Sequence, residues 1–319
     1  LFYLRDLDLS KNQLNFIDKD FFKSNSLLLT LDLSLNNISF IEIKSFENNH
    51  LLSILNLSYN KLKDSFEITL NVKLYNLDLT NNRINSANID DFILNNIIIR
   101  NNDIKNISFL IDSNARYIDL SNNSLSILNS LYLKKLRSFV LSKNIIETID
   151  SNSFSKLRLL KYMDLSINNI KFLDENVFAK SFVLENLNLS YNKIESIHFN
   201  LFKNLVNLQI LDLSYNRLKI INAGSFQGLI SLKNLFLNLN FEMILTTGSL
   251  NGLLSMENIY ISEEIFLANY SYTLKILLQS FKPIYIKQIN SVKYFKSIYF
   301  NLLPTYKYKN LSECKIVIL

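Results

Sequence analysis

The sequence predicts an α/β solenoid, a horseshoe in which one parallel sheet of about 11 to 13 strands lines the concave side. Irregular or 3-10 segments would form its convex side. Two observations lead to this fold class. A short motif of spaced leucines, written LENLNLSYNKI at residues 184–194, recurs along the chain, and an asparagine recurs with it at a nearly constant interval. Fold and core therefore come from stacked copies of one unit.

Each copy begins with a predicted strand. Leu187 and Leu189 have the spacing that sends two side chains to one face of a strand and Asn188 to the other. Asn192 then ends the strand, and its carboxamide can donate to and accept from the backbone of its own turn and of the neighbouring turn. The following segment carries Ile197 and Phe202 inward and returns the chain to the next strand. One copy cannot bury these side chains alone, so stacking is required.

The asparagines define the order of the turns. Their spacings are 24, 24, 22, 20, 21 and 21 residues and then 24 four times. We expect them to form a structural ladder of backbone hydrogen bonds, with these members: Asn12, Asn36, Asn60, Asn82, Asn102, Asn123, Asn144, Asn168, Asn192, Asn216 and Asn240. The regular flanking turns also carry a phenylalanine ten residues after the asparagine, at Phe22, Phe46, Phe154, Phe178, Phe202 and Phe226.

The pattern divides the chain into two parts. Residues 1–264 form the array of about 11 clear repeats, and residues 265–319 hold degenerate final repeats and the start of a C-terminal flank. At the other end Leu4, Leu7 and Leu9 lead directly to Asn12 without a polar cap. An uncapped solenoid end exposes leucines, so we expect this chain to be a fragment of a longer polypeptide.

Charge and cysteine usage point to the C-terminal part. The formal net charge of +6 lies wholly beyond Phe281, where seven lysines oppose only Glu313. This basic tail either contacts a nucleic acid, a sulfated glycan or an anionic membrane, or is a solvated last repeat, and we favour the solvated last repeat.

Cys314 is the single cysteine. It is either a free buried thiol or the partner of a cysteine beyond Leu319 in a cysteine-stapled cap.

Glycosylation acceptors permit export without arguing for it. Roughly six N-x-Ser/Thr triplets would arise by chance at this content of asparagine, serine and threonine. The sequence holds seven: Asn37, Asn56, Asn106, Asn122, Asn188, Asn269 and Asn310.

Catalytic chemistry has almost no raw material in this chain. His50 and His198 are its only histidines, and it has neither a glycine-rich phosphate loop nor a G-x-S-x-G motif. We interpret His198 as a turn residue. We expect no enzyme activity, no cofactor and no metal site. The apolar runs are far shorter than a membrane span, so contact with a membrane is expected only through segments outside this sequence.

The residue between the two strand leucines faces the concave side and is often acidic. A column of acids either holds calcium or a basic ligand, or consists of the short polar residues that this repeat usually has on an exposed strand. We favour the second interpretation. The members of this column are Asp8, Asp32, Asp78, Asp119, Asp164 and Asp212. The usual small polar residues of this face are replaced at Ile98, with Arg100 nearby, and at Val140. We interpret Ile98 and Arg100 as solvent-facing drift in irregular repeats.

The candidate ligand-binding residues are Phe236, Tyr260, Tyr285 and Lys287. The three aromatic residues replace small polar groups on three successive predicted strands, so their rings would form one strip about 10 Å long. Exposed aromatic rings are common binding anchors, and Lys287 would give the strip a cationic edge. In the alternative, residues 262–319 fold back over these rings and make them part of the core.

The repeat written LQILDLSYNRLKIINAGSFQGL at residues 208–229 resembles the typical class of leucine-rich repeat. That class is found in the ectodomains of Toll-like receptors and of chaoptin-like and Slit-like proteins, and the resemblance covers about residues 4–261. It implies an extracellular, non-catalytic receptor or adhesion module. The expected partner is a protein ligand or co-receptor, with a glycan or a nucleic acid as further ligand classes. The cysteine-rich flank of those families is missing. The alternative is an intracellular, cytoplasmic scaffold or inhibitor, for which a single unpaired cysteine is ordinary.

Overall fold

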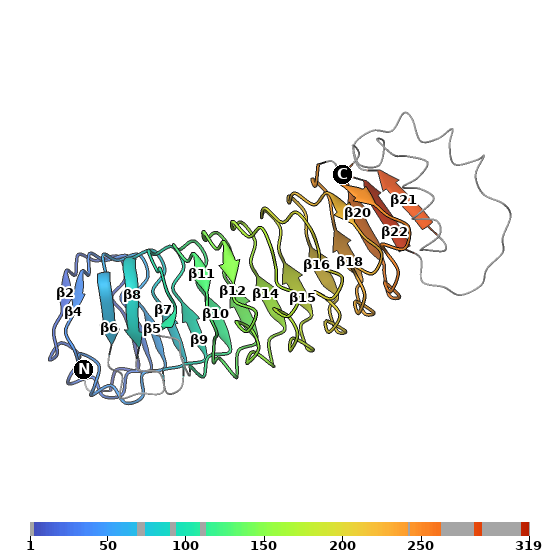
Figure 1. Cartoon of the computed structure of the whole chain (residues 1–319). Coiled ribbons are helices and arrows are strands. Elements are labelled where there is room, and N and C mark those ends of the chain that lie inside the picture. Colours follow the sequence, from blue (N-terminus) through green and yellow to red (C-terminus); the bar gives the residue numbers. More distant parts are fainter. Residues whose placement is uncertain are drawn as a thin grey trace. The chain divides into compact units, whose positions relative to one another are not determined.

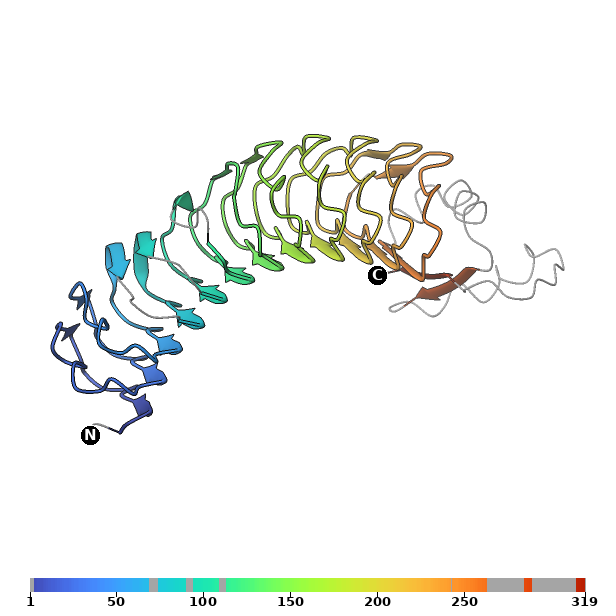
Figure 2. The ribbon, with the colours of Figure 1, turned by 90° about the horizontal axis from the view of Figure 1, so that it is seen from below.

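The computed structural model describes residues 3–68, 74–89, 94–108, 113–241, 243–262, 284–288 and 314–318. The chain divides into two compact units, Leu1–Asn169 and Ile170–Leu319. Each is a solenoid of parallel strands in which every turn places one short strand beside that of the turn before (Figure 1). Within each unit, the sheet strands lie along one side of the stacked turns and the outer segments along the other (Figure 2).

The sheet of the first unit follows the order of the sequence. Its register pairs equivalent residues of successive turns, so that Leu7, Leu31, Leu55 and Leu77 lie in one row. The strands, in spatial order, are β1 (Asp6–Asp8), β3 (Thr30–Asp32), β5 (Ile54–Asn56), β7 (Asn76–Asp78), β9 (Asn96–Ile98), β10 (Tyr117–Asp119), β12 (Ser138–Val140) and β14 (Tyr162–Asp164).

The sheet of the second unit keeps this order only as far as the repeat pattern lasts. Its strands, in spatial order, are β15 (Asn186–Asn188), β16 (Ile210–Asp212), β18 (Asn234–Phe236), β20 (Asn258–Ile261), β22 (Cys314–Ile318) and β21 (Ile284–Gln288). The last strand of the chain, β22, is therefore inserted between β20 and β21.

The outer side of the turns holds short parallel strand pairs and turns. No α-helix occurs in the described parts of the chain, so the α component of the predicted class is not confirmed. The pairs are β2 (Phe16–Ile17) with β4 (Phe40–Ile41), β6 (Lys63–Ile68) with β8 (Arg83–Ile89), β11 (Ile127–Leu128) with β13 (Thr148–Ile149), and β17 (Ile220–Ile221) with β19 (Ile244–Leu245). The longest pair, β6 with β8, lies in the turns where the asparagine spacing shortens.

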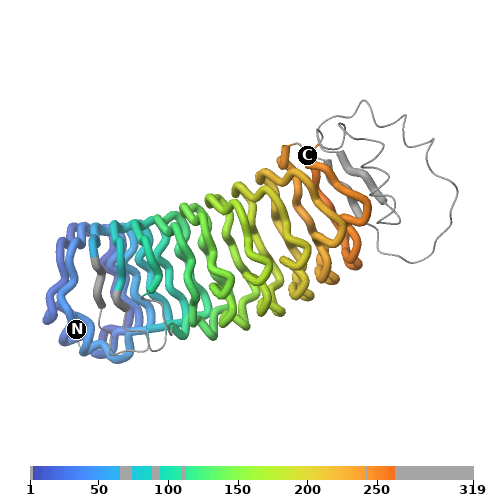
Figure 3. Tube along the Cα trace, in the orientation of Figure 1, coloured from blue at the N-terminus to red at the C-terminus, as the bar shows by residue number. Residues whose placement is uncertain are grey.

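The core is a stack of leucine and phenylalanine rows. Strand leucines such as Leu31, Leu211 and Leu235 are fully buried. The six phenylalanines that follow the ladder asparagines are also buried, and neighbouring rings such as Phe22 and Phe46 stack with centroids 5.8 Å apart. The backbones of successive turns run side by side (Figure 3), which brings like residues into contact from turn to turn.

The ladder asparagines bond two turns at once. Asn216 accepts the Ile194 N–H at 3.0 Å through Oδ1, and its Nδ2 donates to the Leu189 carbonyl of the preceding turn at 2.9 Å. The same Nδ2 donates to the carbonyls of Leu213 and Ser214 within its own turn. Asn36, Asn60, Asn82, Asn102, Asn123, Asn144 and Asn168 repeat these contacts in the first unit. Asn192 and Asn240 likewise accept an N–H from the preceding turn, whereas exposed Asn12 bonds only carbonyls of its own turn.

Candidate binding surface

The exposed face of each sheet carries the first and third residues of its three-residue strands, because the second residue points into the core. The third residue is most often Asp or Asn, and its Oδ1 accepts the N–H two residues further on, as Asp32 accepts from Ser34 at 2.8 Å. The residues that do this are Asp8, Asp32, Asn56, Asp78, Asp119, Asp164, Asn188 and Asp212.

This hydrogen bond gives the acid column a structural task. Each carboxylate satisfies a backbone N–H at the end of its strand, where the chain leaves the sheet. These contacts support the interpretation of the acids as standard residues of the repeat, and they explain why the repeat has an acid at this position. Within the described ranges, no group of three or more histidine, cysteine, aspartate or glutamate residues is placed to hold a metal ion.

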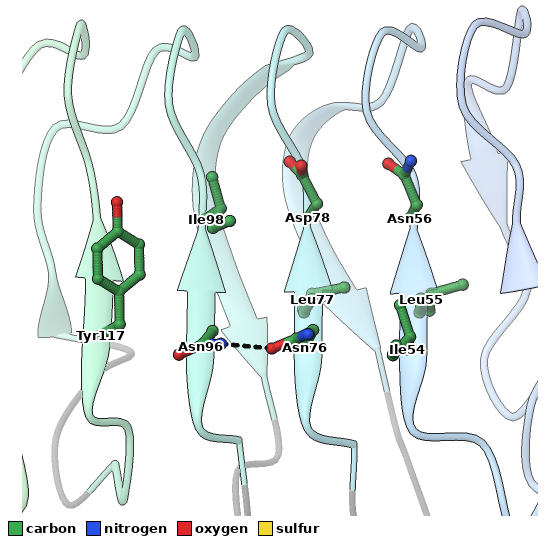
Figure 4. A pocket seen from close by; sticks show the side chains of 9 residues that line it. All are labelled: Ile54, Leu55, Asn56, Asn76, Leu77, Asp78, Asn96, Ile98 and Tyr117. Carbon is green, nitrogen blue, oxygen red and sulfur yellow. Dashed lines mark hydrogen bonds between the residues drawn. The ribbon is translucent and has the colours of Figure 1, made fainter. Parts of the chain in front are cut away.

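A shallow depression of ≈ 550 Å³ lies on the exposed face of the first unit, over β5, β7, β9 and β10 (Figure 4). Asn76 and Asn96 lie on its floor, and the Asn96 carboxamide donates to Asn76 at 2.5 Å. Ile98 stands where neighbouring strands have Asp or Asn, and the Tyr117 ring borders one side. The lining of the depression thus combines amide groups, the carboxylate of Asp78, apolar residues that include Ile54 and Ile98, and one aromatic ring.

Arg100 and Asp119 form an ion pair beside this depression. Their Nη2 and Oδ2 atoms are 2.8 Å apart, and the Asp119 side chain is only 4% exposed. The Tyr117 hydroxyl also donates to Asp119 Oδ2, at 3.3 Å. Arg100 faces solvent as expected, but its guanidinium also neutralises a buried carboxylate that would be costly alone.

The two tyrosines of this face have perturbed acidities. Burial, followed by the charge of Asp119, raises the pKa of Tyr117 above its ordinary value. Burial, followed by the charge of Asp164, raises the pKa of Tyr162 in the same way. Both phenols therefore stay neutral and able to donate hydrogen bonds at physiological pH.

In the second unit, Phe236 and Tyr260 are neighbours in register on β18 and β20. Their rings stack with centroids 4.1 Å apart and an interplanar angle of 6°. Both side chains are half-buried, so the rings are not part of the core. Two of the four predicted ligand-binding residues are thereby brought together on the exposed face.

Tyr285 and Lys287 do not continue this pair as predicted. Because β22 lies between β20 and β21, Tyr260 pairs with Val317, whereas Tyr285 pairs with Lys315. The expectation of three aromatic residues on three successive strands is wrong for this reason. The structure does not describe the side chains of Tyr285 and Lys287. The described part of the candidate site consists of Phe236 and Tyr260.

A second aromatic pair was missed in the sequence. Tyr191 and Tyr215 precede ladder asparagines and adopt a positive φ of 53°, which turns their side chains outward at the rim of the sheet. The rings stack with centroids 3.8 Å apart and are 48% and 39% exposed. The hydrogen bond that the Tyr191 hydroxyl donates to Tyr215 raises the pKa of Tyr191. The phrase LSYN, repeated after 24 residues, was the available signal.

The repeats that carry these aromatic residues have no net formal charge. Residues 170–262 include seven basic and seven acidic residues. Several form ion pairs between turns, such as Lys233 with Glu257 at 3.1 Å and Lys219 with Glu195 at 3.6 Å. His198, predicted as a turn residue, is exposed and lies 3.2 Å from Glu175. Residues 170–262 are therefore neutral as a whole, and the residue that pairs in register with Phe236 on β16 is the acidic Asp212.

Comparisons with known proteins point to one family. The family model described as leucine rich repeat matches residues 2–62, 134–193 and 182–240. Among solved structures, an internalin (InlF) from Listeria monocytogenes str. 4b F2365 is 19% identical, with 80% of this chain and 86% of that chain covered and a TM-score of 0.47. The TLR13–ssRNA13 complex is 18% identical, with coverages of 81% and 64% and a TM-score of 0.33. No curated protein matches the sequence.

None of the described residues forms a helix with the length and apolarity that a membrane span needs.

Proposed function

Because the chain belongs to the leucine-rich repeat family, we propose that it is a non-catalytic ligand-recognition module of a cell-surface receptor or adhesion protein. Its partner is a protein ligand or co-receptor, bound on the exposed face of the sheet in the second unit. The single observation that carries this proposal is the stacked Phe236–Tyr260 pair, which stands where the repeat otherwise places hydrated Asp or Asn.

Aromatic side chains suit protein recognition for a physical reason. They bury much area and lose little side-chain entropy, so a central ring often contributes about 2 kcal/mol or more to binding. Asp212, the register neighbour of Phe236, would repel a polyanion, so the two rings suit a protein surface better. Tyr191 and Tyr215 extend the aromatic area to the rim of the same unit. The site is therefore expected to bind through apolar contact, with little dependence on salt.

Site-specific photo-crosslinking tests this proposal. A photoreactive phenylalanine analogue at position 260 should capture one defined protein from the extracellular face of cells. The same analogue at exposed Ile127, on the outer side of the first unit, is the control. With the captured protein purified, Phe236→Ala and Tyr260→Ala should each weaken binding by about 30-fold, which corresponds to about 2 kcal/mol. Equal capture at both positions, or unchanged affinity in both variants, would contradict the proposal.

An intracellular scaffold or inhibitor is the second candidate function, and the single cysteine favours it. Expression of the full-length protein with glycan mapping separates the two. Export should place a glycan on Asn106 in preference to Asn188, because Asn106 is exposed and lies outside the strands, whereas Asn188 is half-buried in β15. A protein that carries no glycan and is protected from surface labelling would support the intracellular alternative.

A further inference from the structure

Positive charge is concentrated at one edge of the first unit. The chain enters β10, β12 and β14 through segments 113–117, 129–138 and 151–162, and none of these segments contains an acidic residue. They contain seven basic residues, although residues 1–281 sum to a formal charge of zero. Six of the seven, all exposed, carry the argument: Arg116, Lys134, Lys135, Arg137, Arg158 and Lys161.

The stacking of turns brings these cations into columns. Arg137 N–H donates to the Arg116 carbonyl at 2.8 Å, and Lys161 N–H donates to the Arg137 carbonyl at 2.9 Å. Three basic side chains therefore project from adjacent turns, at a spacing of about 4.8 Å set by the sheet. Lys134 and Arg158, each three residues earlier, repeat this alignment in a second column. The positive potentials of side chains at this spacing add together, and such a potential attracts a polyanion.

Two tyrosines stand beside the basic columns. Tyr117, Ser138 and Tyr162 are in register on β10, β12 and β14 and point to the exposed face. The small side chain of Ser138 leaves a slot between the two tyrosines, whose strands are about 10 Å apart. A planar ring stacked in this slot would place its attached chain over Arg116, Arg137 and Lys161. On the far side of Tyr117, the depression continues the surface with the amides of Asn76 and Asn96.

From this geometry we infer that the last three turns of the first unit bind a single-stranded nucleic acid. The phosphates lie along the Arg116, Arg137 and Lys161 column, and a base enters the slot between Tyr117 and Tyr162. Interleaved cations and aromatic rings are the chemistry that such strands require, because the cations neutralise phosphates while every base can stack. This site is separate from the Phe236–Tyr260 pair and does not rest on the proposed protein recognition.

Three carboxylates on this face, Asp78, Asp119 and Asp164, already accept hydrogen bonds within the chain. Asp119 is neutralised by Arg100 and accepts the Tyr117 hydroxyl. Asp164 uses Oδ1 to accept the Ser166 N–H at 2.9 Å. Its carboxylate lies two residues beyond Tyr162 along β14, away from the basic edge, where it can accept a hydrogen bond from a base amino group. A sulfated glycan would satisfy the cations but makes no use of the two tyrosines, so we argue for the nucleic acid.

Fluorescence anisotropy with the purified chain tests the inference. The probe is a labelled twelve-nucleotide oligothymidylate, which cannot pair with itself, and a heparin-derived oligosaccharide is the competing polyanion. The triple variant Arg116→Gln, Arg137→Gln and Lys161→Gln should weaken oligonucleotide binding at least tenfold. Because three phosphate contacts are lost, it should also reduce the slope of log K against log salt by about 2. Tyr162→Ala should weaken binding by about fivefold or more, and Tyr162→Phe should retain it.

A matched triple variant provides the control. Lys171→Gln, Lys180→Gln and Lys203→Gln removes the same charge from exposed positions of the second unit and should change affinity less than twofold. All variants must keep the thermal midpoint of the parent. The inference is overturned if the oligonucleotide does not bind at physiological salt, or if both triple variants weaken it equally. It is also overturned if heparin binds more tightly than the oligonucleotide and Tyr162→Ala leaves both affinities unchanged, which would show that the surface responds only to charge.

Discussion

Replacing Asn216 by alanine should destabilise the chain through one backbone group. Of the four partners of Asn216, the Leu189 carbonyl also accepts from Asn192 at 3.1 Å and the Leu213 carbonyl from Asn240 at 2.9 Å. The Ser214 carbonyl also accepts the Tyr191 N–H at 3.0 Å. Only the buried Ile194 N–H loses its sole side-chain acceptor. An orphaned buried N–H costs about 1–3 kcal/mol, and the weakened carbonyl bonds add a smaller amount.

We therefore expect Asn216→Ala to lower the free energy of unfolding by about 3 kcal/mol. Urea denaturation followed by circular dichroism measures this change. Exposed Asn222 is the control, and Asn222→Ala should change stability by less than about 0.5 kcal/mol. Asn188→Ala is not a silent control, because Asn188 accepts from both the N–H and the hydroxyl of Ser190. Equal unfolding midpoints for Asn216→Ala and the parent would refute the ladder as a stabilising device.

Two further predictions follow from backbone conformation at glycine and from the raised pKa of Tyr162. Gly228→Ala should lower the free energy of unfolding by about 3 kcal/mol or more, because φ is +94° and a new Cβ would collide with the Lys203 backbone. Gly224→Ala should lower it by only about 1 kcal/mol, because φ is +81° but a new Cβ would meet no close contact. Equal urea midpoints for the two variants would contradict this. The pKa of Tyr162 is raised on folding, so its contribution to stability is present below pH 10 and is lost as pH rises through the raised folded-state value. Stability measured by urea denaturation from pH 9 to 12 should therefore fall less in Tyr162→Phe than in the parent, and identical pH profiles would show that Tyr162 is unperturbed.

The stacked-turn fold could be predicted because each of its roles belongs to one position of the repeat. Each clear repeat has leucine or another apolar residue at the same strand positions and then the same asparagine, so Leu211 and Asn216 are equivalent to Leu31 and Asn36 by inspection. The Asp–Ser bond at the strand end is equally local, since the partners are two residues apart, and the phrase LDLS was a sufficient signal for it. It was overlooked because the acid was considered as a ligand and not as an acceptor for its own backbone.

The order of the last strands could not be predicted by the same route. Beyond Ser262 the leucine spacing and the ladder asparagine are both missing, and these are the features that fix register between turns. Without them, any extended segment can pair with the open edge of β20. In the structure the final segment of the chain, β22, takes this position ahead of β21. The assignment of Tyr285 as the neighbour of Tyr260 assumed that sequence order continues, and that assumption failed where the repeat ended.

The basic columns are an example of a charged surface that a running count of charge along the sequence does not reveal. Arg116, Arg137 and Lys161 are scattered over 46 residues that also contain acids, so a running charge count directs attention to the lysines beyond Phe281 instead. Each of the three, however, lies seven residues before a ladder asparagine, namely Asn123, Asn144 and Asn168. In a stacked fold, equal distance from the ladder means adjacency in space, whereas closeness in sequence often means opposite sides of a turn. Charge in such a chain is therefore informative only after the residues have been aligned by turn, and that alignment requires the sequence alone.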